Sequence, residues 1–241
     1  MKIQEIEKEI IEFANNNKSD SLATELKIYF KSPFDFFGLT KKQINDFSKK
    51  LQKSLKRVDR ENLISLINKL HHSNNHELKT FAIVLASNNI DKFELSDFDI
   101  FYFWLQKSCT WDHVDEICIR ITGLLVIKFD LFSQLLKWSN DEHIWVRRAS
   151  LISQLPSVRK NNYQIKLISQ CCSNLITEKD FFIRKAIGWV LRELSEINPK
   201  DSINITSSFS GKISKLSFKE ATRKLNENLR FQISENVKPC K

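Results

Sequence analysis

Apolar residues recur at intervals of three and four along most of the chain, which is the period of amphipathic helices. Only 4 Gly and 4 Pro occur in 241 residues, so there is little material for hairpins or glycine-rich phosphate loops. We therefore predict an all-α protein. The expected helices cover residues 3–13, 20–30, a stretch from Thr40, 61–71, 77–86, 96–107, a stretch from Trp111, 131–138, 142–155, 163–175, 181–197 and a stretch from Ser217.

Three of the predicted helix boundaries depend on one or two residues each. Thr40 is a predicted N-cap. Pro156 is predicted to end the helix over 142–155, because proline removes a backbone donor from a helix interior. The pair Ser217-x-x-Glu220 has the spacing of a capping box and is predicted to open the last helix, which continues past Leu229.

The helical pattern contains an internal repeat. The segment Trp145–Ala149 resembles Phe182–Ala186, at an interval of 186 − 149 = 37 residues. HEAT-type helical hairpins have about this length, and they bury their apolar faces by stacking on one another. We predict one domain over 1–241, built as a curved superhelix with a concave basic groove and a short flexible tail at about 232–241.

The same interval links candidate functional residues. Trp111 and Asp115 are four residues apart and so share one face of a helix. One repeat later stands Arg148, and two repeats later stand Lys185 and Trp189. We therefore expect these five residues near one face of three successive repeats.

The charge of the chain points to a polyanionic partner. The formal net charge is +9, with a pI of about 9.3, which makes nucleic acid the first candidate. Basic residues gather in two segments, 41–60 with eight Lys/Arg against two acids, and 212–241 with eight against three. Each segment is either a solvated helix face or a phosphate-binding surface, and composition alone does not decide between them.

Cysteine usage and the N-terminus indicate an intracellular protein. The five cysteines are odd in number and follow neither a zinc spacing nor a disulfide framework, so we expect reduced thiols. The first ten residues form a charged amphipathic pattern rather than a signal peptide. No apolar run has the length of a membrane span. We expect a soluble cytoplasmic protein that is not bound to a membrane.

The candidate chemistry centres on Asp115. There is no Ser-His-Asp order and no metal-ligand spacing, and a polar helix end explains the run His71, His72 and His76 better than a metal site. A carboxylate flanked by tryptophans in a basic groove suits cleavage of an N-glycosidic bond to a base that is already positively charged. Such a base leaves without a general acid, and the enzyme need only stabilise the sugar cation and orient water. Cation–π contacts add to this stabilisation.

A purely structural interpretation stands beside this one. Thr110 or Asp112 would cap a helix, and Trp111 and Trp145 would belong to the core. Arg147 would then pair with a neighbouring acid. Residue spacing alone favours this interpretation over catalysis.

The sequence also resembles a known family, the AlkD-type DNA alkylation repair glycosylases, over about residues 20–230. The match follows the order and approximate spacing of the family's motifs, and its central and C-terminal parts are the more specific ones. It rests on Trp111-Asp112-x-Val114-Asp115, Ile144–Ala149, Phe181–Glu193, Asn198-Pro199, Leu216–Ala221 and, more loosely, Tyr29–Leu39.

The resemblance implies HEAT-like repeats with a concave DNA-binding surface. It implies a monofunctional glycosylase that removes N3-alkyladenine and N7-alkylguanine from duplex DNA, without a metal or cofactor and without a deep base pocket. Asp115 would be the catalytic carboxylate. Site roles follow for the aromatics Trp111 and Trp189, which contact the deoxyribose, for Arg148 beside the DNA backbone, and for Tyr29, with Lys185 and Arg192 as further DNA-binding residues.

One departure concerns the N-terminal segment, where Lys42 occupies a position at which the family often has proline, and the arginine expected nearby is absent. This departure puts the DNA contacts of the early helices in question, but not the role of the carboxylate. We expect a monomeric enzyme. Two other functions stay open: a non-catalytic repeat module that binds damaged or branched DNA, and a scaffold for an acidic protein.

Overall fold

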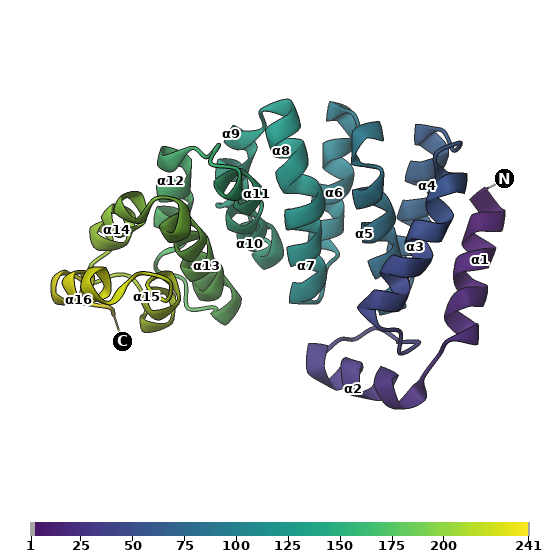
Figure 1. Cartoon of the computed structure of the whole chain (residues 1–241), viewed down its shortest axis with the longest axis horizontal. Coiled ribbons are helices and arrows are strands. Elements are labelled where there is room, and N and C mark those ends of the chain that lie inside the picture. The colour runs from purple at the N-terminus through teal and green to yellow at the C-terminus, as the bar shows by residue number, and fades with distance from the viewer. Residues whose placement is uncertain (1–2, 241) are drawn as a thin grey trace. The chain divides into compact units, whose positions relative to one another are not determined.

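The all-α prediction is confirmed by the computed structural model, which describes residues 3–240 (Figure 1). Within these residues, β-pairing is limited to two isolated bridges, Asp35–Asn75 and Ser214–Cys240. The chain divides into two compact units, Met1–Ile121 and Thr122–Lys241. Each unit is described by itself.

The first unit is a succession of neighbouring helices. Helix α4 packs on α5, α3 on α5, α1 on α4, and both α5 and α6 pack on α7. The helices of this unit are α1 (Ile3–Asn16), α2 (Asp20–Phe30), α3 (Lys41–Leu55), α4 (Arg60–His71), α5 (His76–Asn88), the 3-10 turns Ile90–Lys92 and Leu95–Asp97, α6 (Phe98–Gln106) and α7 (Trp111–Ile117), followed by the π-helical segment Cys118–Thr122 at the division between the units.

Helix α2 runs across the direction of its neighbours (Figure 1) and contains no buried residue. The loop after it is held instead by the buried carboxylate of Glu77, which accepts the backbone N–H groups of Phe37, Gly38 and Leu39 at 3.1, 2.7 and 3.0 Å. Gly38 has a φ of 82°, and a Cβ there would lie 2.1 Å from the carbonyl oxygen of Ser19. A glycine is therefore required where the loop meets the start of α2.

In the second unit, α13 is the central helix, and α10, α11, α12, α14 and α15 all contact it. Its buried side chains include Ile183, Ile187, Val190 and Leu191. The helices of this unit are α8 (Gly123–Phe129), α9 (Phe132–Trp138), α10 (Ile144–Ile152), α11 (Leu155–Arg159), α12 (Ile165–Leu175), α13 (Phe181–Ile197), α14 (Pro199–Ser208), α15 (Lys215–Ala221) and α16 (Glu227–Asn236).

Within each unit, hydrogen bonds join residues that are separated by about the repeat interval of 37 residues. These bonds join residues 36 to 38 positions apart. The helices therefore form a repeat-like arrangement with the predicted spacing. The bonds are Gln52–Asn89, Arg60–Asp97 and Asn68–Trp104 in the first unit, and Leu135–Cys171 and Tyr163–Asp201 in the second.

One predicted cap is confirmed and one predicted stop is wrong. Thr40 caps α3, in a capping box with Gln43. Pro156 does not end a helix: α10 already ends at Ile152, and Pro156 lies in the first turn of α11. The backbone N–H that proline lacks has no helical partner in a first turn, so proline is tolerated there.

The start of the last helix is also different from the prediction. Ser214 caps α15, and its hydroxyl accepts the N–H of Ser217 at 3.0 Å. The side chain of Ser217 instead donates to the carbonyl of Arg184 on α13, at 2.8 Å. The chain then breaks before α16. The segment expected to be a flexible tail is helical to Asn236, and Cys240 donates its N–H to Ile213.

Burial follows the predicted helix faces only in part. In the aromatic helix α6, Phe98, Phe101 and Trp104 are buried, but Phe103 is 60% exposed.

All five cysteines are free thiols. Among the described residues, no helix combines the length and the apolar character needed to cross a bilayer.

Candidate functional site

Trp111, the first residue of α7, lies against aromatic side chains of α2. Its ring centroid is 5.8 Å from that of Phe30 and 6.3 Å from that of Tyr29. Trp111 is half-buried, whereas Tyr29 is 65% exposed. The structure thus brings together Tyr29 and Trp111, two of the predicted site residues, and adds Phe30, which sequence reasoning missed.

Asp115 lies one helical turn after Trp111 and is buried, at 8% exposure. A carboxylate shielded from water interacts more strongly with a nearby positive charge than an exposed one does. A shielded carboxylate one helical turn from Trp111 is therefore suited to stabilising a developing cation.

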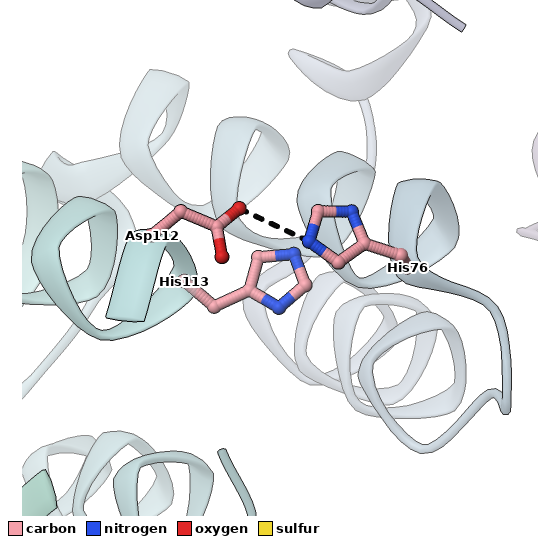
Figure 2. Close-up of side chains that lie close together, drawn as sticks. All are labelled: His76, Asp112 and His113. Atoms are coloured by element: carbon pink, nitrogen blue, oxygen red, sulfur yellow. Dashed lines mark ion pairs between the residues drawn. The ribbon is translucent and has the colours of Figure 1, made fainter. Parts of the chain in front are cut away.

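Asp112, the other carboxylate of α7, has a different environment (Figure 2). Its Oδ2 lies 3.0 Å from Nε2 of His76, at the start of α5, and the His76 ring stacks on that of His113 with centroids 4.0 Å apart. Burial raises the pKa of Asp112, but the contacts with His76 and the neighbouring His113 outweigh burial and lower the pKa to about 2. Asp112 is therefore an ionised partner of His76 and not a helix cap.

The same three side chains are a possible metal site. Among the described residues, one group of potential ligands, made of His76, Asp112 and His113, has donor atoms within 4.8 Å of one another. Sequence reasoning had assigned His76 to a polar helix end. The interval from His76 to Asp112 is 112 − 76 = 36 residues, so the repeat period was the signal that could have linked them.

In the second unit, the ring of Trp189 on α13 is held by polar contacts. Its Nε1–H donates to Oε1 of Glu193 at 2.9 Å, and the guanidinium of Arg192 lies 5.9 Å from the ring centroid. Arg159 donates to the other oxygen of Glu193 at 2.7 Å. Burial raises the pKa of Glu193, but these hydrogen bonds outweigh burial and bring the pKa below its usual value. The carboxylate therefore stays ionised. Glu193 was not among the predicted site residues.

Lys185 and Arg192 belong to a basic cluster around the buried carboxylate of Glu220 on α15. Lys185 Nζ lies 2.7 Å from this carboxylate, Arg192 also pairs with it, and Arg223 lies 3.7 Å away. The pKa of Lys185 is lowered by burial and then by the charges of Arg192, Arg223 and Arg148. Cations therefore outnumber the carboxylate they share, and the cluster has an excess of positive charge.

The two arginines of α10 have different environments. Arg148 is 4% exposed, and its guanidinium donates to the carbonyl of Phe182. Arg147 forms a two-point ion pair with Glu178, at 2.6 and 3.3 Å. The structural interpretation of the sequence is thus confirmed for Arg147.

The predicted site residues fall into two sets. Tyr29, Trp111 and Asp115 belong to the first unit, and they come from α2 and α7. The remaining residues belong to the second unit and lie on α10 and α13. They are Arg148, Lys185, Trp189 and Arg192.

Comparisons with known proteins give a consistent result. A family model described as DNA alkylation repair enzyme matches residues 7–225. A solved structure of a predicted DNA alkylation repair enzyme from Enterococcus faecalis superimposes with a TM-score of 0.80 at 26% identity, covering 87% of this chain and 97% of that one. Protein smu.31 of Streptococcus mutans UA159 shares the fold, with a TM-score of 0.55 at 15% identity over 76% of this chain and 100% of its own. No curated protein sequence matches.

Proposed function

The chain belongs to the DNA alkylation repair enzyme family, and from this premise we propose that it is a monofunctional DNA glycosylase for cationic alkylated purines. Membership places it among enzymes of DNA repair. The proposal adds the reaction: hydrolysis of the N-glycosidic bond of N3-alkyladenine and N7-alkylguanine in duplex DNA, as a step of base excision repair. The observation that carries it is the buried carboxylate of Asp115, one helical turn from the half-buried ring of Trp111.

The charge of the lesion explains why one carboxylate is sufficient. When the bond between C1′ and the base nitrogen breaks, the bonding electrons neutralise the positive base, which leaves without being protonated. The deoxyribose is left with oxocarbenium character. Asp115 stabilises this charge and orients a water molecule, whose oxygen bonds to C1′ and whose proton passes to solvent. This chemistry needs no metal and no cofactor.

Aromatic side chains add to this stabilisation. In the proposal, Trp111 and Trp189 contact the deoxyribose, and Tyr29 lies at the same surface as Trp111. An aromatic face contributes about 0.5–2 kcal/mol to the binding of a cation. Because Tyr29 is exposed and Trp111 is only half-buried, we propose that they meet the lesion at the DNA surface rather than in a deep base-flipping pocket.

The basic residues of the second unit are the proposed phosphate contacts. Lys185 and Arg192 lie in the cluster around Glu220, which has an excess of positive charge. Arg148 is the most buried of the three, so the DNA backbone would have to approach the protein surface closely to contact it. The net charge of +9 acts in the same direction, because phosphate neutralisation releases counterions. We propose double-stranded DNA as the partner, and we expect the protein to bind it as a monomer.

The test is release of 7-methylguanine from methylated duplex DNA, measured by chromatography. The native protein should release the base. Asp115→Asn should lose at least about 100-fold in rate, the order that one preorganised electrostatic group contributes, while still binding DNA. Asp99→Asn, an exposed site on α6, is the matched control and should keep full activity. No release by the native protein, or undiminished release by Asp115→Asn, would overturn the proposal, and binding without release would favour a non-catalytic DNA-binding module.

A further inference from the structure

His76 lies at the centre of a stack of rings that joins three parts of the first unit. Phe36, from the loop between α2 and α3, stacks on it with ring centroids 4.5 Å apart and an interplanar angle of 17°. His113 of α7 stacks on it at 4.0 Å and 25°. Phe30 of α2 packs on the same His76 ring at 4.9 Å. One imidazole from α5 therefore contacts α2, the following loop and α7.

A polar contact between His76 and Asp112 accompanies this stack. His76 Nε2 lies 3.0 Å from Oδ2 of Asp112, the residue next to Trp111 (Figure 2). The His113 ring is oriented by Thr80 at 3.0 Å and by Thr110 at 3.4 Å. Because a carboxylate that is largely shielded from water is destabilised when it loses its partner, this pair restricts how the first turn of α7 packs on α5.

Both contacts of His76 lead to Trp111. Asp112 is the chain neighbour of Trp111, and Phe30 flanks the Trp111 ring at 5.8 Å. We propose that His76, paired with Asp112 and stacked on Phe30, is a positioning residue that fixes the orientation of the Trp111 ring for base release. The inference rests on the proposed function of Trp111. His76 itself touches no substrate in this scheme.

A metal site is the alternative use of these side chains. Their donor atoms lie within 4.8 Å of one another, but the His76 and His113 rings are stacked and nearly parallel. The lone pair of an imidazole nitrogen lies in the plane of its ring, so one ion cannot lie in both planes unless a ring rotates. The observed arrangement therefore favours a stacked histidine in contact with a carboxylate over coordination, and zinc binding becomes an outcome of the test.

The first measurement does not depend on catalysis. Protein containing 5-fluorotryptophan is examined by fluorine NMR, with the Trp111 signal assigned through Trp111→Phe. His76→Ala should shift or broaden the Trp111 signal and leave that of Trp189, in the other unit, in place. His76→Gln, which keeps an N–H donor, should restore part of the native signal. His72→Gln, at the exposed neighbouring histidine, is the control and should change nothing.

An unchanged Trp111 signal in folded His76→Ala would overturn the proposal. If His76→Ala does not fold, His76→Gln and Asp112→Asn decide the same question. Titration with zinc chloride tests the alternative metal site. One equivalent of zinc bound by the native protein and lost in His76→Gln would show a metal site in place of a positioning pair.

The second measurement is a double-mutant cycle on the release of 7-methylguanine. His76→Ala should slow release about tenfold to a hundredfold when Trp111 is present, the size expected for a displaced active-site group. In a Trp111→Ala background it should cause no further loss. Equal losses in both backgrounds would show a merely structural role and overturn the proposal. If the native protein releases no base, the proposed function fails, while the NMR result still decides the role of His76.

Discussion

Gly188 on α13 and Glu220 on α15 are in such close contact that a Cβ on Gly188 would lie 2.5 Å from the Cβ of Glu220. It would also lie 2.9 Å from the carbonyl oxygen of Ser217. The seam between α13 and α15 therefore depends on the absence of a side chain at this position. The same Glu220 carboxylate pairs with Lys185 and Arg192, so the seam also positions the basic cluster.

Gly188→Ala should destabilise the protein by about 1–3 kcal/mol, the usual cost of overpacking. The sign is informative, because alanine in an unobstructed helix would stabilise it by about 0.5–1 kcal/mol. Urea unfolding followed by circular dichroism measures the change. Ser173→Ala, at an exposed position on α12, should shift stability by less than about 0.5 kcal/mol. A Gly188→Ala protein as stable as the native one would contradict the close contact.

Glu77→Gln should loosen the loop after α2. The Glu77 carboxylate accepts three backbone N–H groups, and a glutamine keeps only one acceptor oxygen and places an NH2 against a donor. We expect a loss of about 2 kcal/mol, since hydrogen bonds to charged groups contribute about 1.5–3 kcal/mol. Denaturant unfolding of Glu77→Gln, compared with the exposed Glu61→Gln on α4, gives the answer. Equal stability of the two variants would refute the role of Glu77.

Stability should fall as the pH drops below about 6.5, partly because of His71. Burial, and then the charges of Lys79, His113 and His72, lower the pKa of His71 to about 2. Between pH 6.5 and 2 the unfolded state therefore binds a proton at this histidine that the folded state does not. Folding stability declines with falling pH over that window, by on the order of 1 kcal/mol per pH unit.

His71→Phe should make this decline shallower and keep the packing, because the His71 ring stacks on Trp104 with centroids 4.1 Å apart. The measurement is the free energy of unfolding in urea at several pH values between 5 and 7. His113, whose pKa is lowered to about 3 mainly by burial, should still contribute to the remaining slope. An identical slope in His71→Phe and native protein would rule out this source of acid sensitivity.

Lys185→Gln should weaken DNA binding and reduce its salt dependence. Each phosphate contact adds about one to the slope of log affinity against log salt, so the loss of one contact lowers the slope by about that amount. Fluorescence anisotropy with a labelled duplex at several salt concentrations measures both quantities. Lys166→Gln, exposed on α12, is the matched control. If Lys185→Gln keeps the native slope, Lys185 serves Glu220 and not DNA.

Much of the fold was predictable because it follows from local spacing. The helix over 181–197 was placed at its observed bounds, and Thr40 was assigned correctly as a cap. The errors have local causes too. Pro156 is tolerated inside a first turn, and Ser214 caps α15 three residues before the predicted Ser217. A sequence motif identifies residues that are able to cap, and the surrounding packing decides which of them does.

By itself, the sequence determined the helical class, the interval of about 37 residues and the shared face of Trp111 and Asp115, because helix periodicity depends only on neighbouring residues. The tertiary structure alone decided the partners. It pairs Asp112 with His76, buries Arg148 beside Phe182 and sets Lys185 against Glu220. These contacts join residues 34 to 36 positions apart on different helices. Which side chains meet at that distance depends on how the helices pack, and helix periodicity does not specify it.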